Sequence, residues 1–121
     1  MARILVIDDD DNFRVLICLF LENAGYEVME ASNGRIALDM QRETPADLII
    51  TDIFMPEKEG TELIMDINDE FPKVKVIVMS GGGNIADIDF LNLAKNLGAL
   101  KTFQKPFRQA DLLAAVEELL A

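Results

Sequence analysis

The chain has 121 residues, half of them hydrophobic, which is enough to bury one core without disulfide bonds or a structural metal. Its 22 acidic residues against 11 basic ones give a formal net charge of −11, which argues against direct nucleic-acid binding and suits a divalent cation or a basic partner. The absence of histidine and the single cysteine exclude histidine-assisted nucleophiles, imidazole metal sites and an internal disulfide. We expect one domain spanning residues 1–121.

No apolar run approaches the roughly 20 residues needed to span a bilayer. The amino terminus also lacks the charged and apolar regions of a signal peptide. These two features predict a cytoplasmic protein that does not enter a membrane.

Five short runs read as strands, of which the fifth is the weakest, and the third has the composition of a strand buried on both faces of a parallel sheet. The third is the most informative, because it ends on a single carboxylate, Asp52, with Pro56 four residues later. A carboxylate there must either face water at the mouth of the sheet or meet a cation. The predicted strands lie at residues 3–7, 26–31, 47–51, 74–79 and 100–104.

Residues with the apolar spacing of a helix follow each of these runs. Asp10 and Asp11 favour the N-terminus of the first helix, where negative charge is stabilising. Ser32 or Asn33 is expected to cap the second. In the first helix the residues expected to face the sheet are Phe13, Leu16, Ile17, Phe20 and Ala24. The predicted helices cover residues 13–24, 33–42, 61–71, 109–120 and a fourth that starts near 84 or 87 and ends at 97.

This alternation predicts right-handed βαβ crossovers and a parallel sheet covered on both faces. We expect an α/β, flavodoxin-like doubly wound three-layer sandwich, with a five-stranded parallel sheet of order 2-1-3-4-5 and five helices. In such folds the ligand site lies at the carboxyl ends of the strands, where the strand order reverses.

Polar residues gather at that edge of the predicted sheet. Asp8 and Asp9 follow the first strand, Asp52 ends the third, Ser80 follows the fourth and Lys105 follows the fifth. Because neighbouring strands lie about 4.8 Å apart, the three carboxylates would crowd one crevice, which favours protonation or a bound cation. Magnesium suits such oxygen ligands. With Lys105 and Ser80 nearby, the set would stabilise a phosphoryl group on one carboxylate.

Four motifs follow one another in a specific order and spacing. They are Ile4-Leu5-Val6-Ile7-Asp8-Asp9, the stretch from Asp47 to Pro56 with Gly60, Met79-Ser80-Gly81, and Gly98-Ala99 followed by Lys105-Pro106-Phe107. Together they resemble the receiver domains of two-component response regulators, and the resemblance covers the whole chain. It implies that Asp52 is the phosphoacceptor and that the donor is a histidine of a sensor histidine kinase or a histidine phosphotransfer protein.

The resemblance also implies the ligands of the site. Asp8 and Asp9 would hold Mg²⁺, with Mn²⁺ as the alternative ion. The implied direct ligands are the side chains of Asp9 and Asp52 and the backbone carbonyl of Phe54. Ser80 and Lys105 would contact the phosphoryl oxygens. The Lys105–Pro106 bond would be a candidate cis peptide, which only X-Pro bonds adopt at modest cost.

The implied function is a signalling switch that catalyses only its own phosphorylation and dephosphorylation and acts on no external substrate. Phosphorylation would change the surface around the fourth helix, fifth strand and fifth helix, toward an unknown target or output domain, with a phosphorylation-dependent dimer as a further expectation. The alternatives are a receiver-like module that is not phosphorylated, and a metal-dependent phosphohydrolase. Hydrolases of the haloacid-dehalogenase type place a second Asp two residues after the nucleophile, where this chain has Phe54.

The chain departs from the family three residues before Lys105, where an aromatic switch residue is common. Thr102 occupies that position and Phe103 follows it. Because side chains alternate across a strand, Phe103 is expected to point to the opposite face and to belong to the core. A conformational change would then pass instead through the loop that contains Gly81 and Gly82.

The first predicted helix carries more apolar residues than one core stripe needs. Val15, Cys18 and Leu19 would form a second strip where charge is expected, and exposed apolar patches often mark partner surfaces. Since this helix helps to dock the phosphodonor in the family, we predict docking there, with Pro106 and Phe107 as further candidates. The alternatives are self-association and an apolar strip without a function.

Overall fold

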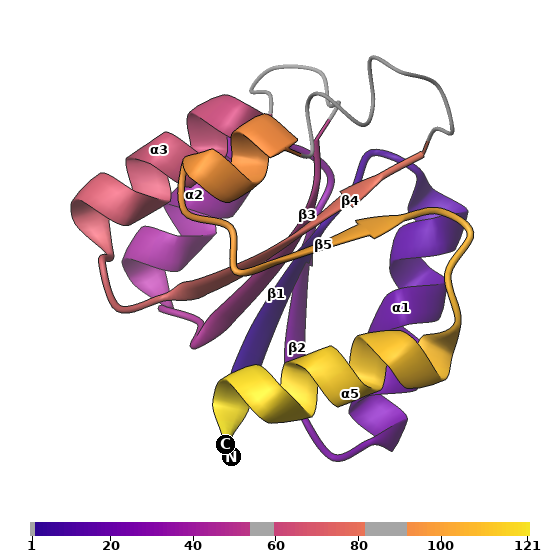
Figure 1. The fold of residues 1–121 in the computed structure, drawn as a ribbon. Coiled ribbons are helices and arrows are strands. Elements are labelled where there is room, and N and C mark those ends of the chain that lie inside the picture. The colour runs from indigo at the N-terminus through magenta and orange to yellow at the C-terminus, as the bar shows by residue number, and fades with distance from the viewer. Residues whose placement is uncertain (1, 54–59, 82–91) are drawn as a thin grey trace.

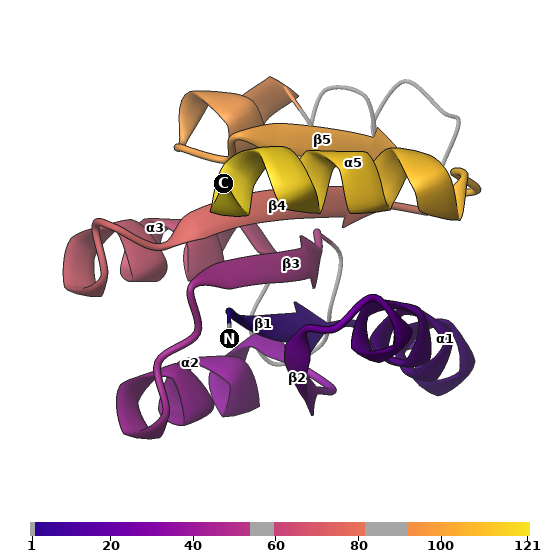
Figure 2. The same ribbon diagram turned by 90° about the horizontal axis from the view of Figure 1, so that it is seen from below.

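The computed structural model describes residues 2–53, 60–81 and 92–121. These residues form three layers, a central sheet with helices on both faces (Figures 1 and 2). Helices α1 (Asp11–Asn23) and α5 (Gln109–Leu120) cover one face, and α2 (Gly34–Glu43) and α3 (Gly60–Glu70) cover the other. This arrangement is the predicted doubly wound sandwich.

Five parallel strands form the sheet in the order β2-β1-β3-β4-β5, which confirms the predicted order. Each strand begins and ends within one residue of its prediction. They are β1 (Arg3–Ile7), β2 (Glu27–Ala31), β3 (Leu48–Asp52), β4 (Lys75–Ser80) and β5 (Lys101–Gln104).

Local signals in the sequence set the ends of the helices. Asp10 caps α1 by accepting a hydrogen bond from the Phe13 N–H, and Asn33 caps α2 in the same way. Gly25, with a φ of 100°, follows α1. Most of the predicted fourth helix lies outside the described residues, but residues 92–96 are helical, and Gly98 follows with a φ of 122°. No helix within the described ranges is long and apolar enough to cross a membrane.

The core has two halves, one on each face of the sheet. Successive residues of the central strands point to opposite faces, so Leu5 packs with the α2 and α3 side and Ile4 with the α1 and α5 side. Gln41 is a buried polar residue of α2, and its side-chain amide accepts from the N–H of Ala46 and donates to the C=O of Ala46. Apolar burial on both faces therefore fixes the register that brings the strand ends together.

The predicted inward stripe of α1 is confirmed for Phe13, Ile17 and Phe20, which pack in the core, and is wrong for Leu16 and Ala24, which are exposed. Cys18 is 4 % exposed and belongs to the core, whereas Leu16, expected to face inward, is 51 % exposed. The exposed strip consists instead of Val15, Leu16 and Leu19, called the α1 strip below. Residues 15–21 are all apolar, so the sequence permits several phases, and packing against the sheet selects the one that buries Leu21.

Candidate functional site

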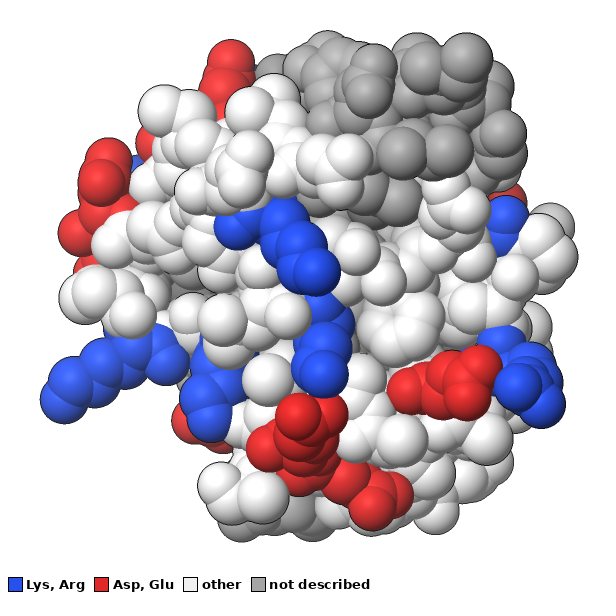
Figure 3. Space-filling view, viewed as in Figure 1, with Lys and Arg blue, Asp and Glu red and all other residues white. Residues whose placement is uncertain are grey.

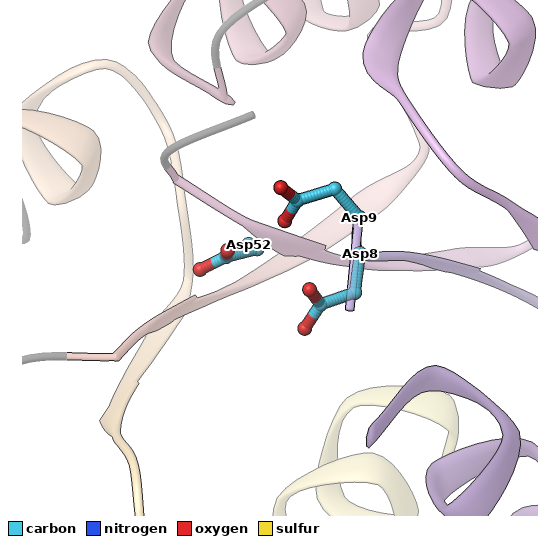
Figure 4. A group of neighbouring side chains, drawn as sticks. All are labelled: Asp8, Asp9 and Asp52. Carbon is cyan, nitrogen blue, oxygen red and sulfur yellow. The ribbon is translucent and has the colours of Figure 1, made fainter. Parts of the chain in front are cut away.

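Three carboxylates meet beyond the carboxyl ends of β1 and β3 (Figure 4). Asp52 is the last residue of β3, and Asp8 follows β1 directly. Because β1 and β3 are paired neighbours, one oxygen each of Asp8, Asp9 and Asp52 lie within 4.8 Å of one another. Asp8 is fully buried, Asp52 is 7 % exposed, and Asp9 is exposed. The site thus has a buried floor and an opening to solvent on the Asp9 side.

Lys105 supplies a positive charge inside this group. Its Nζ donates a hydrogen bond to Asp8 Oδ2 at 2.6 Å and lies 3.9 Å from Asp52 Oδ1. The other Asp8 oxygen accepts from the Asp10 N–H at 3.0 Å. The ammonium group also lies 4.2 Å from the centre of the Phe13 ring, which suits a cation–π contact. Both oxygens of Asp8 therefore have partners within the protein.

Strand β5 brings Lys105 to this edge of the sheet. The Lys105 N–H donates to the Ser80 carbonyl at 2.7 Å, which ties the end of β5 to the end of β4. The Lys105–Pro106 bond is cis, as predicted. Ser80 is fully buried as the last residue of β4. Met79, the residue before Ser80, pairs with Asp52 of β3. The two proposed phosphate-contacting residues and the proposed acceptor thus lie at the carboxyl ends of three adjacent strands.

Burial raises the pKa of Asp52 to about 7. The positive charge of Lys105 opposes this rise, the charge of Asp8 adds to it, and a hydrogen bond from the Ile53 N–H, at 3.0 Å, lowers it. The dominant cause is desolvation of the charged form. Near neutral pH, the Asp52 carboxyl is therefore poised between its two protonation states.

The donor chemistry of the three carboxylates fits a small divalent cation. Mg²⁺ prefers oxygen ligands, takes one or two carboxylates and keeps several waters, which the opening at Asp9 can admit. A cation would also offset the repulsion among Asp8, Asp9 and Asp52. The predicted carbonyl ligand at Phe54 lies outside the described residues.

The switch candidates lie on opposite faces of β5. Thr102 pairs with Val78, which packs on the α2 and α3 side. Phe103 pairs with Met79, packs on the α1 and α5 side, and lies 5.3 Å from Phe107 between ring centres. This is the orientation that strand alternation predicts. Of the glycine candidates, Gly81 is exposed, and Gly82 lies outside the described residues.

The docking candidates on α1 and in the loop after β5 differ in their exposure to solvent. Val15 and Leu19 are 44 % and 55 % exposed, Pro106 is exposed and Phe107 is half-buried. The Phe107 ring packs edge-on against Phe13, with centres 5.8 Å apart. Contact between α1 and the loop after β5 therefore runs through aromatic packing next to Lys105.

Two residues of the site were missed by sequence reasoning, Phe13 and Arg14. Arg14 donates from Nη1 to the Asp8 carbonyl at 2.8 Å. The position of Arg14 in the sequence could have indicated this contact. A positive charge near the N-terminus of a helix is unfavourable with the helix dipole unless it has a specific partner. No pattern in the sequence indicates that the Phe13 ring lies under Lys105.

The raised pKa of Asp52 predicts a pH dependence of stability. Its folded-state pKa of about 7 lies above the ordinary value of 3.8, so the unfolded chain binds fewer protons between these values. The stability of the metal-free protein should therefore fall as pH rises through this window. The fall in the free energy of unfolding should be on the order of 1–2 kcal/mol after allowance for solvent screening. Asp52→Asn should remove it.

Urea unfolding in EDTA at about pH 5 and about pH 8 measures this difference. Asp69→Asn is the matched control, since Asp69 is an exposed carboxylate on α3. The same change in stability with pH for Asp52→Asn and Asp69→Asn would contradict the assignment.

Comparison with known proteins agrees with this geometry. The sequence profile of the response regulator receiver domain matches residues 4–117. The chain is 36 % identical to the response regulator receiver protein CpdR of Brucella abortus, over 99 % of this chain and 98 % of that protein. It is 34 % identical to the chemotaxis protein CheY of Thermotoga maritima, over 97 % and 96 %.

Solved structures show the same relationship. The receiver domain of NtrX from Brucella abortus superposes with a TM-score of 0.90 at 29 % identity and covers 97 % of each chain. A receiver domain protein from Clostridium thermocellum gives the same score at 34 % identity, over 98 % of this chain and 94 % of that one. The chain belongs to the response regulator receiver domains, the phosphorylation-based signalling modules of two-component systems.

Proposed function

We propose that Asp52 accepts a phosphoryl group from a phosphohistidine of a sensor histidine kinase or a histidine phosphotransfer protein, in a reaction that depends on Mg²⁺. One observation carries this proposal. The oxygens of Asp8, Asp9 and Asp52 converge within 4.8 Å, and the Lys105 ammonium lies against two of these carboxylates. Such a cluster is poorly suited to stabilising a fold, because buried like charges repel.

In the proposed step an Asp52 oxygen attacks the phosphorus of the donor. A new O–P bond forms while the N–P bond breaks, and its electron pair stays on the imidazole nitrogen. The attacking carboxyl must be ionised, so the charge of Lys105, which lowers the pKa of Asp52, favours the reactive form. Bound Mg²⁺ would supply further charge neutralisation at the carboxylates and at the phosphoryl oxygens.

The other site residues have distinct proposed roles. Asp9 and Asp52, with the Phe54 carbonyl, would hold the ion directly. Asp8, whose two oxygens already accept hydrogen bonds, would orient Lys105. The Lys105 ammonium and the Ser80 hydroxyl would then contact the phosphoryl oxygens.

The resulting signal would leave through the surface near β5. Phosphorylation would shift the population of conformers, and the Ser80 and Gly81 segment at the end of β4 joins the site to residues 82–96. Figure 3 shows that the face over β5 and α5 carries basic and acidic groups side by side, with uncharged surface around them. A surface of this kind suits a protein target or an output domain.

The α1 strip is the proposed docking surface for the phosphodonor. It lies on the helix whose N-terminus adjoins the site, because Asp10 both caps α1 and donates its N–H to Asp8. A partner seated there would bring its histidine to the opening beside Asp9. Exposed apolar surface of this kind is typical of protein interfaces.

Acetyl phosphate and Mg²⁺ test the chemical proposal without a partner. We expect intact-protein mass spectrometry to show the gain of one phosphoryl group, which is lost in EDTA and in Asp52→Asn. Steady release of phosphate without accumulation would favour the phosphohydrolase. No gain of mass under any condition would favour the interaction module.

Leu19→Glu tests the docking surface. A charge placed in an apolar interface should slow transfer from the cognate kinase roughly tenfold or more, while the reaction with acetyl phosphate stays unchanged. Met65→Glu is the control, because Met65 is 52 % exposed on α3, on the opposite face of the sheet. Equal transfer rates for the two variants would refute docking on the α1 strip.

A further inference from the structure

Arg14 makes three short contacts from a nearly buried position. Its side chain is 12 % exposed. Nη1 donates to the Asp8 carbonyl, Nε to Glu30 Oε1, and Nη2 pairs with Asp11 Oδ1, each at 2.8 Å. A planar guanidinium with three fixed partners has little freedom to move. It joins α1, the end of β2 and the loop after β1.

The carbonyl that Arg14 holds belongs to the peptide linking Asp8 to Asp9. Other contacts fix Asp8, since its N–H donates to the Ala31 carbonyl at 3.2 Å and its two carboxylate oxygens have partners. Among the described residues, none makes a hydrogen bond to the exposed Asp9 carboxylate. The direction of the Asp9 side chain therefore follows from the orientation of this peptide.

We propose that Arg14 is a positioning residue for the metal site and acts through Asp9. By holding the Asp8–Asp9 peptide, it keeps the Asp9 carboxylate within reach of the oxygens of Asp8 and Asp52. This inference rests on the proposed function, because it takes Asp9 to be a metal ligand. Residues that orient metal ligands without touching the ion typically change metal affinity by 10–100-fold when they are replaced.

The proposed effect of Arg14 on metal affinity comes from its hydrogen bonds and not from its positive charge. The guanidinium is already paired with two carboxylates, those of Asp11 and Glu30, so its charge is compensated locally. Arg14→Lys keeps the positive charge but loses the fork that binds three acceptors at once. Lysine at this position should therefore restore little of the affinity.

The chain provides a matched control at the other end of β1. Arg3 donates from Nε to Glu27 at 2.7 Å and from Nη1 to the Pro45 carbonyl at 3.1 Å. Its contacts repeat those of Arg14, a glutamate and a backbone carbonyl, but at the amino edge of the sheet. Arg3→Met thus removes the same charge and the same kinds of hydrogen bond without touching the site.

Calorimetric titration of the unphosphorylated protein with Mg²⁺ tests the inference. We expect Arg14→Met to weaken binding about tenfold or more, Arg14→Lys to stay at least fivefold weak, and Arg3→Met to stay within twofold of the wild type. Urea unfolding in EDTA confirms that each variant is folded. Wild-type affinity in Arg14→Met or in Arg14→Lys would overturn the positioning role.

A double-mutant cycle tests the route through Asp9. If Arg14 acts by placing that carboxylate, Arg14→Met should add less than twofold to the weakening caused by Asp9→Asn. A full additional loss in the double variant would overturn the route. Failure of the wild type itself to bind Mg²⁺ would overturn the proposed metal site as well, which separates the two claims.

Discussion

The ammonium group of Lys105 lies among three carboxylates that the sheet forces together. Parallel pairing of β1 with β3 leaves no freedom to separate Asp8 from Asp52, since apolar residues buried on both faces fix the register. With all three carboxylates ionised, one ammonium leaves a formal charge of −2 at this edge of the sheet. Protonation of Asp52, whose pKa burial raises to about 7, or a bound cation relieves this excess. The proposed binding of a divalent ion and the proposed reactivity of Asp52 both follow from this excess of negative charge.

Most of the fold could be predicted from the sequence, because its signals are local and repeated. Apolar runs located every strand to within one residue, and Asn33 and Gly25 marked helix ends through capping and positive φ. The rotation of α1 could not be predicted, because residues 15–21 are uniformly apolar. Only packing against the sheet decides that Cys18 is buried and Leu16 exposed.

The site could be predicted to the same extent and for a similar reason. Asp8, Asp52 and Lys105 each follow or end a strand, so the strand topology alone places them at one edge of the sheet. Their side-chain conformations are not needed for this prediction. The contacts of Arg14 and Phe13 depend instead on side-chain direction within α1, which no spacing rule specifies. The directions of the switch candidates on β5 could be predicted, in contrast, because side chains alternate across a strand. Phe103 faces the α1 and α5 side, and threonine at position 102 faces the other.

Titration of the Asp52 carboxyl carbon by NMR, with and without Mg²⁺, tests whether a cation binds at this group of carboxylates. We expect a midpoint near pH 7 in EDTA, set mainly by burial, and a midpoint lower by roughly two units when Mg²⁺ is saturating, because an adjacent cation favours the ionised form. A midpoint that is the same with and without Mg²⁺ would contradict the claim that the three carboxylates form a cation site around Asp52.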